Sequence, residues 1–305
     1  MHEESLRVAS EADRLKSSAT LPRVLTAAVL IPAVVAAVWW GPTGLIAALT
    51  GLVTLLALLE FFALGARAGL YGYRIWTCVC ALALLLGQWS ATEAESWSVG
   101  RSLTLTRVTG PPPSVLLPLV LVVFVLGAAG IALSSRRPLV EVLPALGISA
   151  AGLLFVALPL SFLVRLHGAG RQGPKLLLFV LVLVWIGDTL AYFVGRWAGR
   201  LLMAPQLSPK KTWEGAAANL LGSLGVALVF ARWISIEPRH LVVMAALGNI
   251  SGQVGDLLES AYKRSAGVKD SGGLLPGHGG VLDRIDALIL AAPVVWYYFV
   301  LVVGR

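Results

Sequence analysis

The stretch Ser114-Val-Leu-Leu-Pro-Leu-Val-Leu-Val-Val-Phe-Val-Leu-Gly-Ala-Ala-Gly-Ile-Ala-Leu133 decides the fold class, because it carries no charged side chain over its whole length. At a rise of about 1.5 Å per residue, a helix of this length spans roughly 30 Å, the thickness of the hydrocarbon core of a bilayer. A helix also satisfies its own backbone hydrogen bonds, which lipid cannot do. The stretch therefore predicts a transmembrane helix.

Runs of the same kind recur along the chain on both sides of this stretch. Hydrophobic residues make up 57% of the 305 residues, and charged residues only 13%. No alternating strands and no polar segment of soluble-domain size interrupt the pattern. The predicted fold class is all-α, a polytopic membrane helical bundle. We expect about nine transmembrane helices, at 22–40, 43–64, 74–90, 114–133, 139–164, 175–195, 213–234, 239–259 and 283–303.

A polar loop, residues 91–113, divides the predicted helices into two groups. We expect a short cytoplasmic segment at 1–21, three helices within 22–90 and six helices within 114–305. Glu60 is the only acidic residue in the first three spans, whereas charged groups gather in and beside the later six. This distribution indicates a scaffold or subunit-packing role for the first group and a catalytic membrane region in the second.

An odd number of spans puts the two ends of the chain on opposite sides of the membrane. With a cytoplasmic N-terminus, most of the 24 lysine and arginine residues fall in inside segments, as the positive-inside rule requires. These loops and their contact with anionic lipid explain the net charge of +8, so no nucleic-acid partner is expected. The first span lacks the features of a cleaved signal peptide. We predict a multi-pass protein of the inner (cytoplasmic) membrane.

The segment 260–286, SAYKRSAGVKDSGGLLPGHGGVLDRID, concentrates glycines and charged side chains within this apolar background. Glycines let backbone N–H groups approach an anion, and lysine and arginine bind phosphate oxygens. Carboxylates bind a hard divalent cation such as Mg²⁺. Together these groups predict a site for a metal-bound polyphosphate. The alternative is a solvated loop whose basic residues obey the positive-inside rule and whose Asp283 caps the next helix.

Two polar features lie inside the predicted spans. Asp188 is a carboxylate within a hydrophobic helix, which favours a functional role and a structural pair with a neighbouring basic residue about equally. Asp256, Ser260 and Lys263 follow helical spacing and form one polar stripe. Glu259 can form a simple pair with Lys263 across one helical turn, whereas Asp256 cannot, so Asp256 is the stronger functional candidate.

Ser208 and Pro209 predict the start of a helix, because a hydroxyl can cap it and proline suits its first position. This start places Lys210 and Lys211 beside exposed N–H groups, an arrangement suited to anions. Anchoring of the two lysines at the membrane surface is the alternative.

The pattern Ser-x2-Lys-Arg-x4-Lys-Asp-x-Gly-x2-Leu-Pro-x-His-Gly-Gly-x2-Asp-Arg-x-Asp, as it stands at Ser260 to Asp286, resembles the signature of the phosphatidate cytidylyltransferase (CDP-diacylglycerol synthase) family. Residues 188–196 and 208–215 are similar to two further segments of that family. The resemblance implies an integral-membrane enzyme that joins CTP and phosphatidic acid and releases pyrophosphate. It also implies a homodimer.

The expected site combines these residue chemistries with the resemblance. The expected metal ligands are Asp256, Asp283 and Asp286, which would hold one or two Mg²⁺ ions, with a monovalent cation allowed beside them. Asp283 and Asp286 lie three apart and so share one helix face. The expected catalytic residues are Asp256, Lys263, Arg264, Lys269, Asp270, His278, Asp283, Arg284 and Asp286. The expected substrate-binding residues are Asp188, Ser208, Lys210, Lys211, Gly277, Gly279 and Gly280.

Two other functions use the same features. A CTP-dependent lipid-alcohol kinase would transfer the γ-phosphoryl group of CTP instead of the cytidylyl group. An ion-coupled secondary transporter could use the intramembrane Asp188 and Asp256. The clustering of polar groups on one membrane side and the absence of paired broken helices disfavour the transporter.

Overall fold

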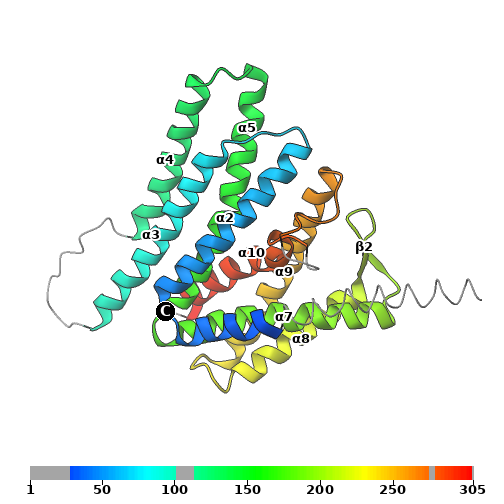
Figure 1. Cartoon of the computed structure of the whole chain (residues 1–305). Coiled ribbons are helices and arrows are strands. Elements are labelled where there is room, and N and C mark those ends of the chain that lie inside the picture. The colour runs from blue at the N-terminus through cyan, green and yellow to red at the C-terminus, as the bar shows by residue number, and fades with distance from the viewer. Residues whose placement is uncertain (1–27, 101–112, 275–278, 304–305) are drawn as a thin grey trace, which may run out of the picture.

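The computed structural model describes residues 28–100, 113–274 and 279–303, and it confirms the all-α membrane architecture (Figure 1). Eight of the described helices are long and apolar enough to cross a membrane, and a shorter apolar helix, Ala28–Trp40, precedes them. Each of these helices falls on one of the predicted apolar runs. The expectation of about nine membrane helices therefore agrees with the described part of the chain.

Short connections join the helices along the chain. The first four elements are α2 (Thr43–Arg67), α3 (Arg74–Gly100), α4 (Pro113–Ser134) and α5 (Leu139–Ala151). A π-helical turn (Gly152–Ala157) joins α5 to α6 (Leu158–His167), and a 3-10 turn (Gly170–Gln172) leads into α7 (Gly173–Ala198). The last three helices are α8 (Trp213–Phe230), α9 (Pro238–Ser265) and α10 (Leu282–Tyr298), and α10 ends in a π-helical turn (Phe299–Val303).

Two helices extend beyond their apolar runs. α3 continues to Gly100, into the segment predicted as the start of the 91–113 loop, and α9 continues to Ser265. The residues after the run of α3 include alanine and glutamate, and those after the run of α9 include alanine, lysine and arginine, all of which favour a helix. The extension of α9 places Lys263 and Arg264 on a regular helix.

The segment between α7 and α8 is a β-hairpin, formed by β1 (Leu202–Ala204) and β2 (Ser208–Thr212). The prediction that Ser208 and Pro209 begin a helix is therefore wrong. α8 begins at Trp213, and its N-cap is Thr212, whose Oγ1 accepts a hydrogen bond from the Gly215 N–H at 3.2 Å. The strand pairing and the later cap together place Lys210 and Lys211 on a strand, and not at a helix N-terminus.

The core lies where α6 and α7 pack against α2, α3 and α10. Leu160 and Leu166 of α6 and Phe179 of α7 are fully buried. α4 differs, because it packs mainly on α3 and leaves side chains such as Val125 and Leu126 exposed. Exposed apolar side chains on a membrane-spanning helix are suited to lipid or to another membrane protein.

The connections at one end of the bundle are tied to one another. Because consecutive spans reverse direction, four connecting segments lie toward the same end, at 68–73, 135–138, 199–212 and 266–274 (Figure 1). Arg137 donates a hydrogen bond to the Tyr71 carbonyl oxygen at 2.7 Å, and Arg264 donates from Nε to the Leu207 carbonyl oxygen at 3.0 Å. The second of these bonds joins the hairpin to the end of α9, so the segment 199–212 contacts the polar segment that begins at residue 260.

Candidate active site

A cavity of about 360 Å³ lies among α7, the hairpin, α8, α9 and α10. This volume is in the usual range for small-molecule sites, about 300–1,000 Å³. Its charged lining residues are Asp188, Lys210, Lys211, Asp256, Asp283 and Asp286. All six are among the residues that the sequence predicts for the site.

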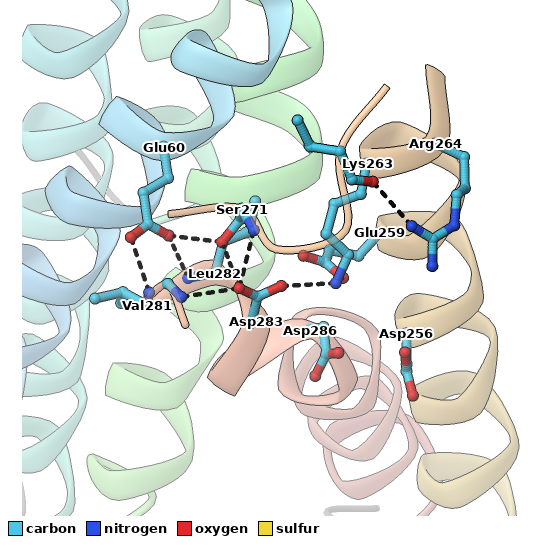
Figure 2. A network of polar contacts seen from close by, with 12 residues as sticks. Glu60, Asp256, Glu259, Lys263, Arg264, Ser271, Val281, Leu282, Asp283 and Asp286 are labelled. Atoms are coloured by element: carbon cyan, nitrogen blue, oxygen red, sulfur yellow. Dashed lines mark hydrogen bonds and ion pairs between the residues drawn. The ribbon is translucent and has the colours of Figure 1, made fainter. Parts of the chain in front are cut away.

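Three carboxylates converge on one side of this cavity. Asp256 and Glu259 lie three apart on α9 and Asp286 lies on α10, and one oxygen from each falls within 4.8 Å of the others. Figure 2 shows Asp256 and Asp286 on the facing sides of these two helices. The Glu259 side chain is fully buried, and its Oε1 accepts no hydrogen bond from any residue that the structure describes. Glu259, which sequence reasoning ranked below Asp256, therefore belongs to the same acidic cluster.

Lys263 joins this cluster to Asp283. Its Nζ lies 2.5 Å from Oε2 of Glu259 and 2.6 Å from Oδ1 of Asp283 (Figure 2). The Lys263 side chain is only 11% exposed and the Asp283 side chain only 8%. The pairing of Glu259 with Lys263, expected from their spacing, is confirmed, and the ammonium group serves two carboxylates at once.

Asp283 binds the loop that precedes α10. Its Oδ2 accepts hydrogen bonds from the backbone N–H groups of Ser271 and Gly280, at 2.9 and 2.8 Å, and from the Ser271 hydroxyl at 3.0 Å. With Lys263 on Oδ1, both oxygens of Asp283 are engaged. Asp283 and Asp286 line the same cavity, as their spacing predicts, but among the described residues the three-carboxylate cluster includes only Asp286 of the two.

Glu60, which sequence reasoning assigned to a scaffold helix, reaches the same loop from α2. Its Oε1 accepts the N–H of Val281 at 3.0 Å, and its Oε2 accepts the N–H of Leu282 at 2.9 Å and the Ser271 hydroxyl at 2.9 Å (Figure 2). Glu60 thus caps the start of α10. The signal for it was present, because a lone carboxylate in an apolar span usually has a polar partner.

The hairpin brings two lysines to the cavity. Lys211 forms an ion pair with Asp256, and Lys210 is exposed at the rim. Ser208 lies on the same strand, opposite Ala204. Arg264 uses its guanidinium to bind the carbonyl oxygens of Leu207 and Val268, so it holds the hairpin and does not line the cavity.

The other predicted residues of the 260–286 segment are less directly involved. Lys269, Asp270 and Arg284 are exposed and are not among the cavity-lining residues. Gly279 has a φ of +79°, which favours glycine, and Gly280 donates its N–H to Asp283. Two further predicted residues, Gly277 and His278, lie outside the described part of the chain.

A chain of amide side chains holds Asp188 at the cavity wall. Asn219 of α8 donates to Oδ1 of Asp188 at 3.1 Å, and Asn249 of α9 donates to Oδ1 of Asn219. Gln253, one turn further along α9, donates to Oδ1 of Asn249 at 2.6 Å. Within the described ranges, the hydrogen-bond partner of Asp188 is thus an amide, where a neighbouring basic residue was the alternative considered above. The amides were missed because single asparagines and glutamines carry no local signal.

The acidic cluster fits a hard divalent cation such as Mg²⁺. Its three donors are carboxylates, which such ions prefer, and an unpaired oxygen on a buried Glu259 needs a partner. Burying carboxylates this close together is unfavourable unless a positive charge is added. Lys211 supplies part of that charge at Asp256, and Lys263 supplies part of it at Glu259.

Similarity to known proteins agrees with this chemistry. The model of a family described as "Cytidylyltransferase family" matches residues 21–302. A protein of Haemophilus influenzae named phosphatidate cytidylyltransferase is 42% identical over 134 residues, 42% of this chain and 46% of the relative. Proteins with the same name from Brucella abortus and Bacillus subtilis are 41% and 33% identical, over 50% and 48% of this chain and 57% and 56% of their own. The chain thus spans about half the length of the curated relatives it matches.

Proposed function

This chain belongs to the cytidylyltransferase family, as its 260–286 segment predicted, and from that premise we propose that it transfers the cytidylyl group of CTP to phosphatidic acid. A phosphate oxygen of the lipid would attack the α-phosphorus of CTP. The bond between that phosphorus and the bridging oxygen would break, and the electron pair would leave with pyrophosphate. The products would be CDP-diacylglycerol and pyrophosphate.

The proposal rests chiefly on one observation. Lysines and carboxylates line the same cavity at one end of the bundle. CTP and phosphatidic acid together bring about six negative charges, so the site must gather cations to bring them into contact. Lys210 and Lys211 suit the triphosphate, and the acidic cluster suits metal ions that the phosphates share. Such a reaction needs positioning and charge stabilisation more than covalent catalysis by the protein.

Asp256, Glu259 and Asp286 would hold the metal, and the predicted ligand Asp283 borders them through Lys263. A bound Mg²⁺ would neutralise phosphate charge at this site. Lys263 would keep Glu259 and Asp283 oriented while substrates exchange. Asp188, oriented by Asn219, would border the substrates from α7 and repel a misplaced phosphate.

We further propose that the cavity opens to the cytoplasm and that the protein resides in the inner membrane. The support is the lysine and arginine content of the segments at this end of the bundle. CTP would enter past the hairpin, and the lipid would enter sideways from the bilayer. The homodimer implied by the family resemblance is retained as a proposal, and the exposed apolar face of α4 is suited to it.

The decisive experiment supplies purified protein, reconstituted in liposomes that contain phosphatidic acid and a lipid alcohol, with CTP labelled at either the α- or the γ-phosphate. Cytidylyl transfer predicts that only the α-label enters the lipid, that Mg²⁺ is required, and that a chelator stops the reaction. Entry of the γ-label into a lipid alcohol would replace this function by the kinase. Ion flux without CTP turnover would replace it by the transporter.

A further inference from the structure

Glu60 makes three hydrogen bonds to a loop that is far from it in sequence. Its carboxylate oxygens accept hydrogen bonds from the N–H groups of Val281 and Leu282 and from the Ser271 hydroxyl, at donor–acceptor distances of 2.9 to 3.0 Å. Val281 lies 221 residues away. Two of the three donors are at the N-terminus of α10, where the first N–H groups have no partner within the helix.

We propose that Glu60 is a positioning residue for the cytidylyl transfer, because it orients Asp283 through Ser271 and the first turn of α10. This inference rests on the proposed function for its kinetic part only. Glu60 itself would touch neither substrate nor metal, since it is not among the residues that line the cavity.

The Ser271 hydroxyl links the two carboxylates directly. It lies 2.9 Å from Oε2 of Glu60 and 3.0 Å from Oδ2 of Asp283, yet it carries one proton to donate. The Ser271 N–H donates to Asp283 as well. A change at Glu60 therefore alters the hydrogen bonding of Asp283, and through it the position of Lys263 and Glu259.

A carboxylate suits this position better than an amide or an apolar side chain. The two oxygens of Glu60 accept three donors, and negative charge is favourable at a helix N-terminus. Glutamine would keep the length but turn an NH₂ group toward one of the backbone N–H groups. Alanine would leave the N–H groups of Val281 and Leu282 to find other partners, and the Ser271 hydroxyl would keep only Asp283 as its acceptor.

The loop is shaped around the Glu60 side chain. A Cβ added to Gly272 would lie 2.5 Å from Oε1 of Glu60, and one added to Gly280 would overlap both Glu60 and the Ser271 hydroxyl. Such close approach is open only to glycine. Gly280, which the sequence suggested as a substrate-binding position, and Gly272 thus make room for the carboxylate from α2.

The test compares Glu60→Gln, Glu60→Ala, Ser271→Ala and the Glu60→Gln/Ser271→Ala double variant with wild type. Glu141→Gln, an exposed glutamate in the first turn of α5, is the matched control. For each protein, kcat, KM for CTP and the unfolding midpoint in detergent are measured.

We expect kcat to fall about tenfold or more in both Glu60 variants, because small misplacements of reacting groups are costly. KM should change less than about threefold, and the double variant should lose clearly less kcat and unfolding midpoint than the sum of the two single effects.

Two results would overturn the inference. One is an unchanged kcat in both Glu60 variants alongside a lowered unfolding midpoint, which would make Glu60 a purely structural cap. The other is strictly additive effects of Glu60→Gln and Ser271→Ala on the unfolding midpoint, which would show that the two side chains do not act together. If wild type transfers no α-label, the proposed function fails. The additivity of the unfolding midpoints still decides whether Glu60 and Ser271 act together.

Discussion

Lys263 is the residue on which the charge balance of the site depends most. It is nearly buried between Glu259 and Asp283, and it forms an ion pair with both. A buried charge left without its partner is more costly than the pair itself is worth. The lysine is thus a structural requirement before it is a catalytic one.

Replacement of this lysine should therefore reduce stability more than any exposed lysine does. We expect Lys263→Met to lower the free energy of unfolding by about 3–5 kcal/mol, because two carboxylates lose their counter-charge. Lys269→Met, on the exposed loop, should change it by less than about 0.5 kcal/mol. Chemical denaturation of both variants in detergent makes the comparison, and equal stabilities would contradict the buried-pair account.

Asp286 allows a test of the metal cluster that does not depend on turnover. If Mg²⁺ binds there, it should raise the unfolding midpoint of wild type, by about 2.7 kcal/mol in stability at a hundred times its dissociation constant. Asp286→Asn keeps the shape but removes a ligand charge, so the Mg²⁺ effect should shrink and activity should fall roughly a hundredfold. Without Mg²⁺ the variant should be as stable as wild type or more so, because like charges are relieved.

Glu141→Gln serves as the control for this experiment, since its side chain is exposed and remote from the cluster. A Mg²⁺ stabilisation of the same size in Asp286→Asn as in wild type would remove Asp286 from the metal site. The Mg²⁺ effect on the unfolding midpoint and the activity can be measured in the same way for Asp283→Asn. A reduced Mg²⁺ effect would mean that Asp283 binds metal, and an unchanged one that it only holds Lys263 and the loop.

At the scale of elements, the close packing of α7 on α8 positions Asp188. Gly187 of α7 has no room for a side chain, because an added Cβ would overlap Oδ1 of Asn219. Asn219 is the residue that donates to Asp188. The close contact between α7 and α8 beside the candidate site therefore requires a residue without a side chain at position 187.

A methyl group at this point should separate the helices. We expect Gly187→Ala to lower the free energy of unfolding by about 1–3 kcal/mol, as overpacking does, and to lower kcat by disturbing Asp188. Gly225→Ala on α8 is the matched control, because its added Cβ meets no atom within 4 Å. It should be neutral or stabilising by up to about 1 kcal/mol. Similar losses in both variants would point to a general intolerance of alanine in these helices.

At the scale of the whole molecule, the side of the membrane that the cavity faces can be measured directly. Cys78 and Cys80 are the free cysteines of the chain and would first be replaced by alanine. In that background we expect Lys269→Cys to react with a membrane-impermeant maleimide only after cells are permeabilised. Ser235→Cys, in the connection at the opposite end of the bundle, should react in intact cells. The reverse pattern would contradict a cytoplasmic site.

The sequence by itself determined the spans and much of the polar site. A run of apolar residues long enough to cross the bilayer has few alternatives to a helix, so the runs predicted where the helices lie. Asp256, Lys263, Asp283 and Asp286 could be assigned to one region because they lie within or beside two consecutive helices. Spacing of three or four residues reports neighbours on one helix face, and this information is local.

Only the tertiary structure decided which distant groups meet. Glu60 and the start of α10 are brought together by the packing of α2 beside α10, and no periodicity in either segment records that contact. The same holds for Lys211 with Asp256 and for the amide chain from Asn219 to Gln253. The hairpin at 202–212 was missed for a related reason, since its strands are stabilised by each other and by Arg264. Helix propensity and capping describe neighbouring residues, whereas the partners of a buried charge are set by how whole helices pack.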